Sequence, residues 1–166
     1  MNEIASLFLE LKSQELFKEW NKHHAKAYLT HFFSAMSSGK EPTTSWEIGL
    51  YDPQSGKITV FVKLKEDFAI KPEDDVFKQE TTTIEELDVE KARLSCNEAL
   101  DIFKERKEEF FPKEVCGDGF VVLQTLDQKV LWNFTFITKT LKFVNLKINA
   151  QSAEVEGNQT IDLVLK

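Results

Sequence analysis

The sequence predicts an α+β protein in which antiparallel strands, in one curved sheet or two small ones, pack against two helices. Two observations predict this class. Apolar residues recur with the period of a helix in residues 3–37 and 96–110, whereas apolar and polar residues alternate through most of the remainder. Short polar turns separate the alternating stretches, as in antiparallel hairpins. The length suits one domain, so we expect residues 1–166 to form a single domain, with 1–80 and 84–166 as its candidate sub-units.

The first helix is predicted from a long stretch without helix breakers. Residues 3–37 contain neither Pro nor Gly, and Gly39 and Pro42 follow them. The apolar side chains of this stretch occupy two faces, and a break near Ser13 accounts for part of that. A single sheet covers one face only. We therefore expect the helix to be clasped between two layers of one chain or to form a homodimer contact.

A β-hairpin follows the first helix. Residues 46–50 and 58–64 alternate between apolar and polar, and Asp52-Pro-Gln-Ser-Gly-Lys57 supplies the turn between them. Residues 66–83 are acidic and irregular in pattern, with a short edge strand expected around Val76 and Phe77.

The pattern of residues 84–94 fits two structures. Thr83-Ile-Glu-Glu86 is a capping box that opens a long helix, but Ser95-Cys-Asn-Glu98 is a second box with a better apolar run after it. We choose a strand to about Leu94 and a helix from Cys96 to Phe110, which Pro112 terminates.

The rest of the chain is predicted as a four-stranded antiparallel meander. Its strands are Gly119–Thr125, Val130–Ile137, Leu141–Ala150 and Glu154–Leu165. The residues expected in one buried cluster are Phe103, Phe120, Val122, Trp132, Phe134 and Ile148.

Two predicted turns resemble each other. Asp52-Pro-Gln-Ser-Gly-Lys-Ile58 and Asn149-Ala-Gln-Ser-Ala-Glu-Val155 share a polar first residue, Gln-Ser, a small residue, a charge and a β-branched residue. Two related helix-plus-strands units would explain this echo, and so would two independent hairpins with the same turn chemistry.

Residues 92–155 resemble the PepSY family of peptidase propeptide-type domains. Ser95-Cys-Asn-Glu-Ala99 matches the family's helix-opening motif, Leu131-Trp132-Asn-Phe-Thr matches its aromatic strand, and Ile148-Asn-Ala-Gln-Ser-Ala-Glu-Val155 matches its final turn. The resemblance implies a helix on an antiparallel sheet, in a tandem PepSY- or cystatin-like arrangement, and a module that binds or inhibits. Ala153 replaces the family's turn glycine, so we expect a different backbone conformation there.

Composition and charge exclude several classes of protein. With 42% hydrophobic residues, including 14 Phe, the chain has enough apolar surface for a core. Its formal net charge of −7 argues against nucleic acid as a partner. No stretch is apolar for the roughly 20 residues that span a bilayer, and the N-terminus lacks the features of a secretory signal. We expect no membrane partner, a cytoplasmic location, and two reduced cysteines, Cys96 and Cys116.

The candidate site residues lie on the predicted first helix. Trp20, His24, Tyr28 and His31 share one side of it and are candidates for an interaction surface or a ligand groove. The two histidines would lie about 10 Å apart along the helix axis, too far for one metal ion. Cys96, in the first turn of the second helix, has no base near it in the sequence, so we expect it to be a small core residue.

No motif of a phosphate loop, a serine-hydrolase elbow or a zinc protease occurs, so we expect neither a catalytic centre nor a cofactor or metal. The expected function is a non-catalytic binding or protein-interaction module, with an unidentified protein or a second copy as partner. The alternative is a small-ligand carrier with a cavity between helix and sheet.

Overall fold

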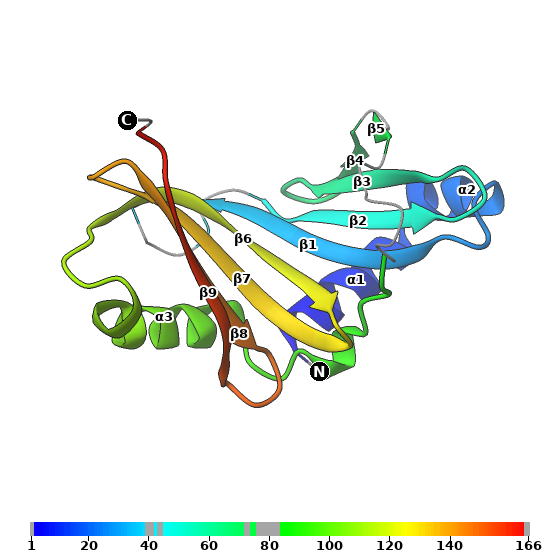
Figure 1. The fold of residues 1–166 in the computed structure, drawn as a ribbon. Helices are drawn as coiled ribbons and strands as arrows, with labels where there is room; N and C mark the ends of the chain where they lie inside the picture. The colour runs from blue at the N-terminus through cyan, green and yellow to red at the C-terminus, as the bar shows by residue number, and fades with distance from the viewer. Residues whose placement is uncertain (1, 39–41, 43–44, 72–73, 76–83, 165–166) are drawn as a thin grey trace.

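The strands form one antiparallel sheet, and the helices cover a single face of it (Figure 1). The computed structural model describes residues 2–38, 42, 45–71, 74–75 and 84–164. The helices are α1 (Glu3–Ser13), α2 (Glu15–Lys22), the 3-10 turn η1 (Val89–Lys91) and α3 (Cys96–Phe110). The strands are β1 (Tyr28–Met36), β2 (Glu47–Asp52), β3 (Lys57–Lys63), β4 (Phe68–Ile70), β5 (Asp74–Asp75), β6 (Cys116–Leu126), β7 (Lys129–Thr138), β8 (Lys142–Asn149) and β9 (Val155–Asp162).

The order of the strands is mirrored about the middle of the sheet. It runs β4-β3-β2-β1-β6-β7-β8-β9, and β5 also pairs with β3. In each half of the chain, helical elements precede a strand that lies at the centre, and the next three strands are added one after another further outward. The α+β class with an antiparallel sheet is confirmed, but the sheet is continuous and larger than the prediction of strands on two helices implied.

The prediction of one helix over residues 3–37 is wrong beyond Lys22. The break near Ser13 is confirmed, because α1 ends there and α2 begins at Glu15. The chain then enters β1, in which Phe32 and Met36 face the helices. The apolar positions 29, 32, 33 and 36 have helical spacing, but they also fit a strand that is apolar on both faces. The two apolar faces therefore belong to different elements, which removes the reason for expecting a clasped helix or a dimer contact there.

The linker before α3 is neither the expected strand nor a helix. Residues 84–88 are irregular and are followed by η1. The backbone N–H of Leu87 donates to the carbonyl of Leu29 (2.8 Å), which ties the linker to β1. The capping box is confirmed, since Ser95 accepts from Glu98 N–H and the Glu98 carboxylate accepts from Ser95 N–H. The strands β4 and β5 lie in a region predicted to be irregular, and the expected edge strand at Val76 and Phe77 falls outside the described residues.

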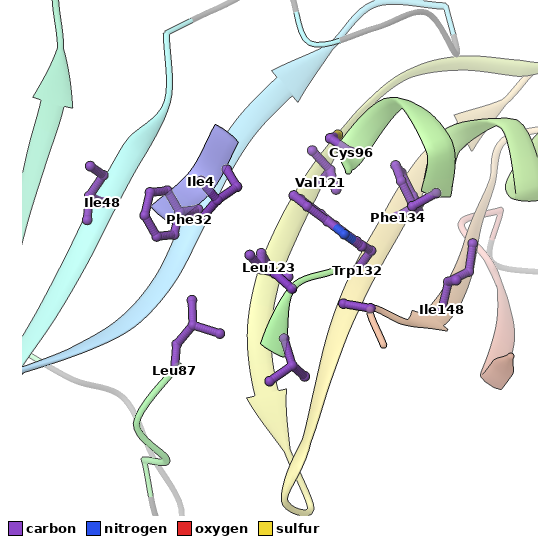
Figure 2. Packing of buried hydrophobic residues seen from close by; sticks show 14 of the residues in the cluster. Ile4, Phe32, Ile48, Leu87, Cys96, Val121, Leu123, Trp132, Phe134 and Ile148 are labelled. Carbon is purple, nitrogen blue, oxygen red and sulfur yellow. The ribbon is translucent and has the colours of Figure 1, made fainter. Parts of the chain in front are cut away.

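The core lies between the helices and the sheet (Figure 2). Trp132 is fully buried beside Leu123 and Ile148, which occupy paired positions on the neighbouring strands. Four of the six predicted core residues are buried, namely Phe103, Trp132, Phe134 and Ile148. The prediction is wrong for the other two, both on β6: Phe120 is 37% exposed and Val122 is half-buried.

The phase of β6 was ambiguous because both of its faces are apolar. Val121 and Leu123 pair with Phe134 and Trp132, and these two residues fix the core side of the sheet. The opposite phase, which carries Phe120, therefore faces away from the helices. A one-residue shift along a strand exchanges its two faces, and only the cross-strand pairing decides between them.

The two similar turns have the same geometry at different places in the fold. Gly56 (φ +71°) and Ala153 (φ +68°) are both left-handed, and each donates to the first residue of its turn, Asp52 and Asn149 respectively. Ala153 thus has the same left-handed conformation as the glycine at the matching position of the first turn. The first turn joins β2 to β3, whereas the second joins β8 to β9, and these are not equivalent positions of the mirrored order. Independent hairpins with one turn chemistry explain the echo.

Candidate binding face of the sheet

Two of the predicted site residues lie on the helical side of the sheet. The indole of Trp20 is nearly buried and meets the ring of Phe61 edge-on, with the centroids 5.2 Å apart. The imidazole of His24 stacks on Trp20, with centroids 4.5 Å apart, and its Nδ1 lies 2.8 Å from the Trp20 carbonyl oxygen. These contacts hold the C-terminal end of α2 against the sheet.

The other two residues lie on β1. The hydroxyl of Tyr28 donates to the carbonyl of Ile84 (2.6 Å), and its ring meets Tyr51 edge-on at 5.7 Å. Burial raises the pKa of Tyr28, and the neighbouring Tyr51 and Glu86 add to the effect. Tyr28 therefore anchors the linker before α3.

His31 lies over a glycine on the neighbouring strand. A Cβ on Gly49 would lie 2.1 Å from Cε1 of His31, so the imidazole occupies the space above that glycine. The Thr30 hydroxyl donates to the Gly49 carbonyl (3.1 Å) and lies 2.9 Å from His31 Nδ1. Because a hydroxyl has one hydrogen, Nδ1 donates to Thr30. Burial lowers the pKa of His31, and the charge of Glu47 opposes this only in part.

The predicted groove of four residues is thus not assembled by the fold. His31 has the opposite phase to Phe32, a core residue, so it points away from the helices, whereas Trp20 and His24 belong to the helix layer. Cys96 is buried in the first turn of α3, and neither Cys96 nor Cys116 forms a disulfide. Among the described residues, no three His, Cys, Asp or Glu side chains are grouped as metal ligands.

A hollow of about 360 Å³ opens on the face of the sheet that the helices leave uncovered. Its lining comes from β6, β7, β8 and β9, at positions whose phase is opposite to that of the core. The lining residues are Phe120, Asn133, Thr135, Phe143, Asn145, Lys147, Gln159 and Ile161. A smaller hollow of about 240 Å³ adjoins it, shares Phe120, Thr135 and Phe143 with it, and is also lined by Asp118.

The floor of the hollow is a network of polar side chains. The Asn145 amide donates to the Asn133 side-chain oxygen, to the Phe134 carbonyl (3.1 Å) and to the Thr135 hydroxyl (2.9 Å). The Lys147 ammonium donates to the Asn145 side-chain oxygen (2.7 Å). Partners on three sides hold Asn145 in one orientation, and its oxygen in turn directs Lys147.

The walls of the hollow are apolar. Phe120 packs on Phe33 with centroids 5.6 Å apart, yet it remains 37% exposed, and Ile161 on the edge strand is 46% exposed. Phe143 pairs with Ile161 across β8 and β9. Large apolar side chains thus surround a polar floor, a combination that is typical of small-molecule sites.

None of these residues was predicted as a site residue, and Phe120 was predicted in the core instead. On β7 and β8 the polar positions alternate with core positions, which is the ordinary pattern of a solvated sheet face. The signal that was present is an aromatic residue, Phe120 or Phe143, on that same polar phase. Recognising it requires the cross-strand register, which the sequence does not contain.

Comparisons with known proteins identify the fold but no family. No family model matches the sequence, and no curated protein does either. A crystal structure from Clostridium difficile 630, described as a "putative lipoprotein", is similar in fold, with a TM-score of 0.51 and 8% sequence identity. The match covers 88% of this chain and 90% of that one. No helix in the described part of the chain combines the length and the apolar character needed to cross a membrane.

Proposed function

We propose that this protein is a non-catalytic binding module whose ligand surface is the uncovered face of β6–β9. The observation that carries the proposal is the hollow with a polar floor and walls of Phe120, Phe143 and Ile161. The lining of this larger hollow contains a single ionisable side chain, Lys147, so it offers no pair of groups for general acid and base catalysis.

A small-ligand carrier is the second candidate, and the size of the hollow favours it, since about 360 Å³ suits a small molecule. The space between helices and sheet is occupied by buried side chains such as Phe103, Trp132 and Phe134, whereas the hollow lies on the opposite face. A carrier of this fold would therefore hold its ligand on the uncovered face and not beneath the helices.

We also propose that each half of the chain is a PepSY- or cystatin-like unit. The mirrored strand order supports this, because in both halves helical elements precede a central strand and the next three strands are added outward from it. The capping box at Ser95 and the meander of β6–β9 support it for the second half. Superposition of residues 84–164 on solved PepSY domains tests it: a helix and strands in the same order would support the relationship, and a different strand order would contradict it.

A fragment screen by two-dimensional amide NMR tests the binding face. We expect fragments to shift the amide signals of β6–β9 more than those of α3. Ile161→Glu should abolish this response because it places a charge in an apolar wall. Leu9→Glu is the matched control, since Leu9 is also an exposed apolar residue, on α1. Fragments that map only to the helix layer, or an unchanged response in Ile161→Glu, would refute the proposal.

A further inference from the structure

The side chains that line the hollow offer several hydrogen-bond donors that have no acceptor among the described residues. The Asn145 amide is fully used within the floor, and its oxygen accepts from Lys147. Lys147 has three N–H groups and uses one of them in the described structure. The side chains of Asn133 and Gln159 also line the hollow, and among the described residues their amide N–H groups donate no hydrogen bond. A ligand rich in acceptor oxygens would complete this arrangement.

The charge of the hollow further restricts the chemical class of ligand that it can bind. Lys147 is half-buried and has no carboxylate partner within the described part of the chain. Two other sheet lysines do have one: Lys129 pairs with Glu156, and Lys142 pairs with Glu114. No carboxylate is among the residues that line the larger hollow, and Asp118 lines only the smaller one, so an anion at Lys147 would meet one positive charge and no negative one within the larger hollow. No arginine is among the lining residues. Because an arginine guanidinium group binds phosphate through two parallel hydrogen bonds, its absence argues against a phosphate ligand.

The walls and the size define the remainder of the ligand. Phe120, Phe143 and Ile161 provide apolar contact above the polar floor, and a hollow of about 360 Å³ lies at the small end of the range for ligand pockets. From these observations, and on the basis of the proposed function, we infer that the hollow binds small amphiphilic monocarboxylates. The carboxylate lies on Lys147 and the neighbouring amides, and the aryl or alkyl body lies between the two phenylalanines.

The test compares three probes that share one body and differ in the head group: phenylbutyrate, phenylbutanol and phenylbutylamine. Dissociation constants are measured by amide NMR titration of the intact chain. We expect phenylbutyrate to bind about tenfold more tightly than the alcohol, because a hydrogen bond to a charged group is worth more than a neutral one, and the amine to bind most weakly.

The variants separate the role of Lys147 from general charge effects. Lys147→Met should weaken phenylbutyrate binding about tenfold and leave phenylbutanol unchanged, whereas Lys147→Arg should retain binding. Lys104→Met is the matched control, because Lys104 is exposed on α3 in the other layer and the variant has the same net charge.

The results test the inference about the ligand class separately from the proposal about the binding face. Equal affinities for the three probes at the hollow, or full affinity in Lys147→Met, would overturn the monocarboxylate inference and leave the binding face intact. The same holds if phenylbutyrate causes no shift while other fragments map to the hollow. Carboxylate binding confined to the helix layer would overturn both.

Discussion

The two tryptophans of the helix–sheet core allow a paired test of what a buried indole hydrogen bond contributes. The Trp132 indole N–H donates to the Leu94 carbonyl (2.8 Å), so it holds the segment before α3 against β7. The Trp20 indole N–H is buried without an acceptor among the described residues. Both side chains are close to fully buried, at 0% and 9% exposure. Replacement by Phe therefore removes a satisfied donor from one site and an unsatisfied donor from the other.

The expected costs follow from these contacts. Trp→Phe removes two ring carbons, which at about 0.8 kcal/mol per buried carbon costs roughly 1.6 kcal/mol at either site. At Trp132 the Leu94 carbonyl also loses its partner, which adds about 1 kcal/mol or more. At Trp20 the substitution removes a buried donor that has no acceptor among the described residues, which offsets about 1 kcal/mol or more of the cost of the lost ring carbons. We expect Trp132→Phe to lower the free energy of unfolding by about 3 kcal/mol and Trp20→Phe by less than about 1 kcal/mol.

Urea unfolding followed by far-UV circular dichroism measures both variants. The slope of the transition should be unchanged, which shows that the denatured states are comparable. Equal costs for the two variants, or a larger cost for Trp20→Phe, would refute the assignment of the Leu94 hydrogen bond as the source of the difference.

Three further predictions concern backbone geometry and pH. Gly119→Ala should destabilise the fold by about 1–3 kcal/mol, because the added Cβ would lie 1.9 Å from a carbonyl oxygen of β7. Gly157→Ala is the control and should be close to neutral, since the nearest atom to its Cβ would be 3.8 Å away. Equal melting temperatures of the two variants would contradict this prediction. Ala153→Gly should gain about 0.5–1 kcal/mol by relieving a left-handed alanine, and a lower melting temperature would contradict that strain. Burial lowers the pKa of His31 below 6.5, so the unfolded chain takes up a proton that the folded chain does not. The free energy of unfolding should therefore fall as the pH is lowered from about 7.5 to about 6, and an identical profile in His31→Asn would show that another group is responsible.

Local signals determined the elements of the second half of the chain. The capping box at Ser95, Pro112 after the helix, and the turn at Asp127-Gln128 each act over a few residues. They placed α3 and the four strands β6–β9 to within a few residues of their observed bounds, and the buried Trp132 was identified correctly. Such signals can be read from a sequence because the interactions behind them are local.

The sequence by itself determined the fold class, the alternation of the strands and the residues of the two similar turns. Only the tertiary structure decided that residues 28–36 are a strand. The spacing of their apolar residues fits a helix and a strand with two apolar faces equally well, and only the pairing with β2 and β6 decides between the two structures. It also decided the phase of β6. Phe120 and Val121 are both apolar, and Val121 is buried because it pairs with Phe134. The hollow follows from that phase, since register across four strands brings Phe120 together with Lys147, and register is a property of the assembled sheet.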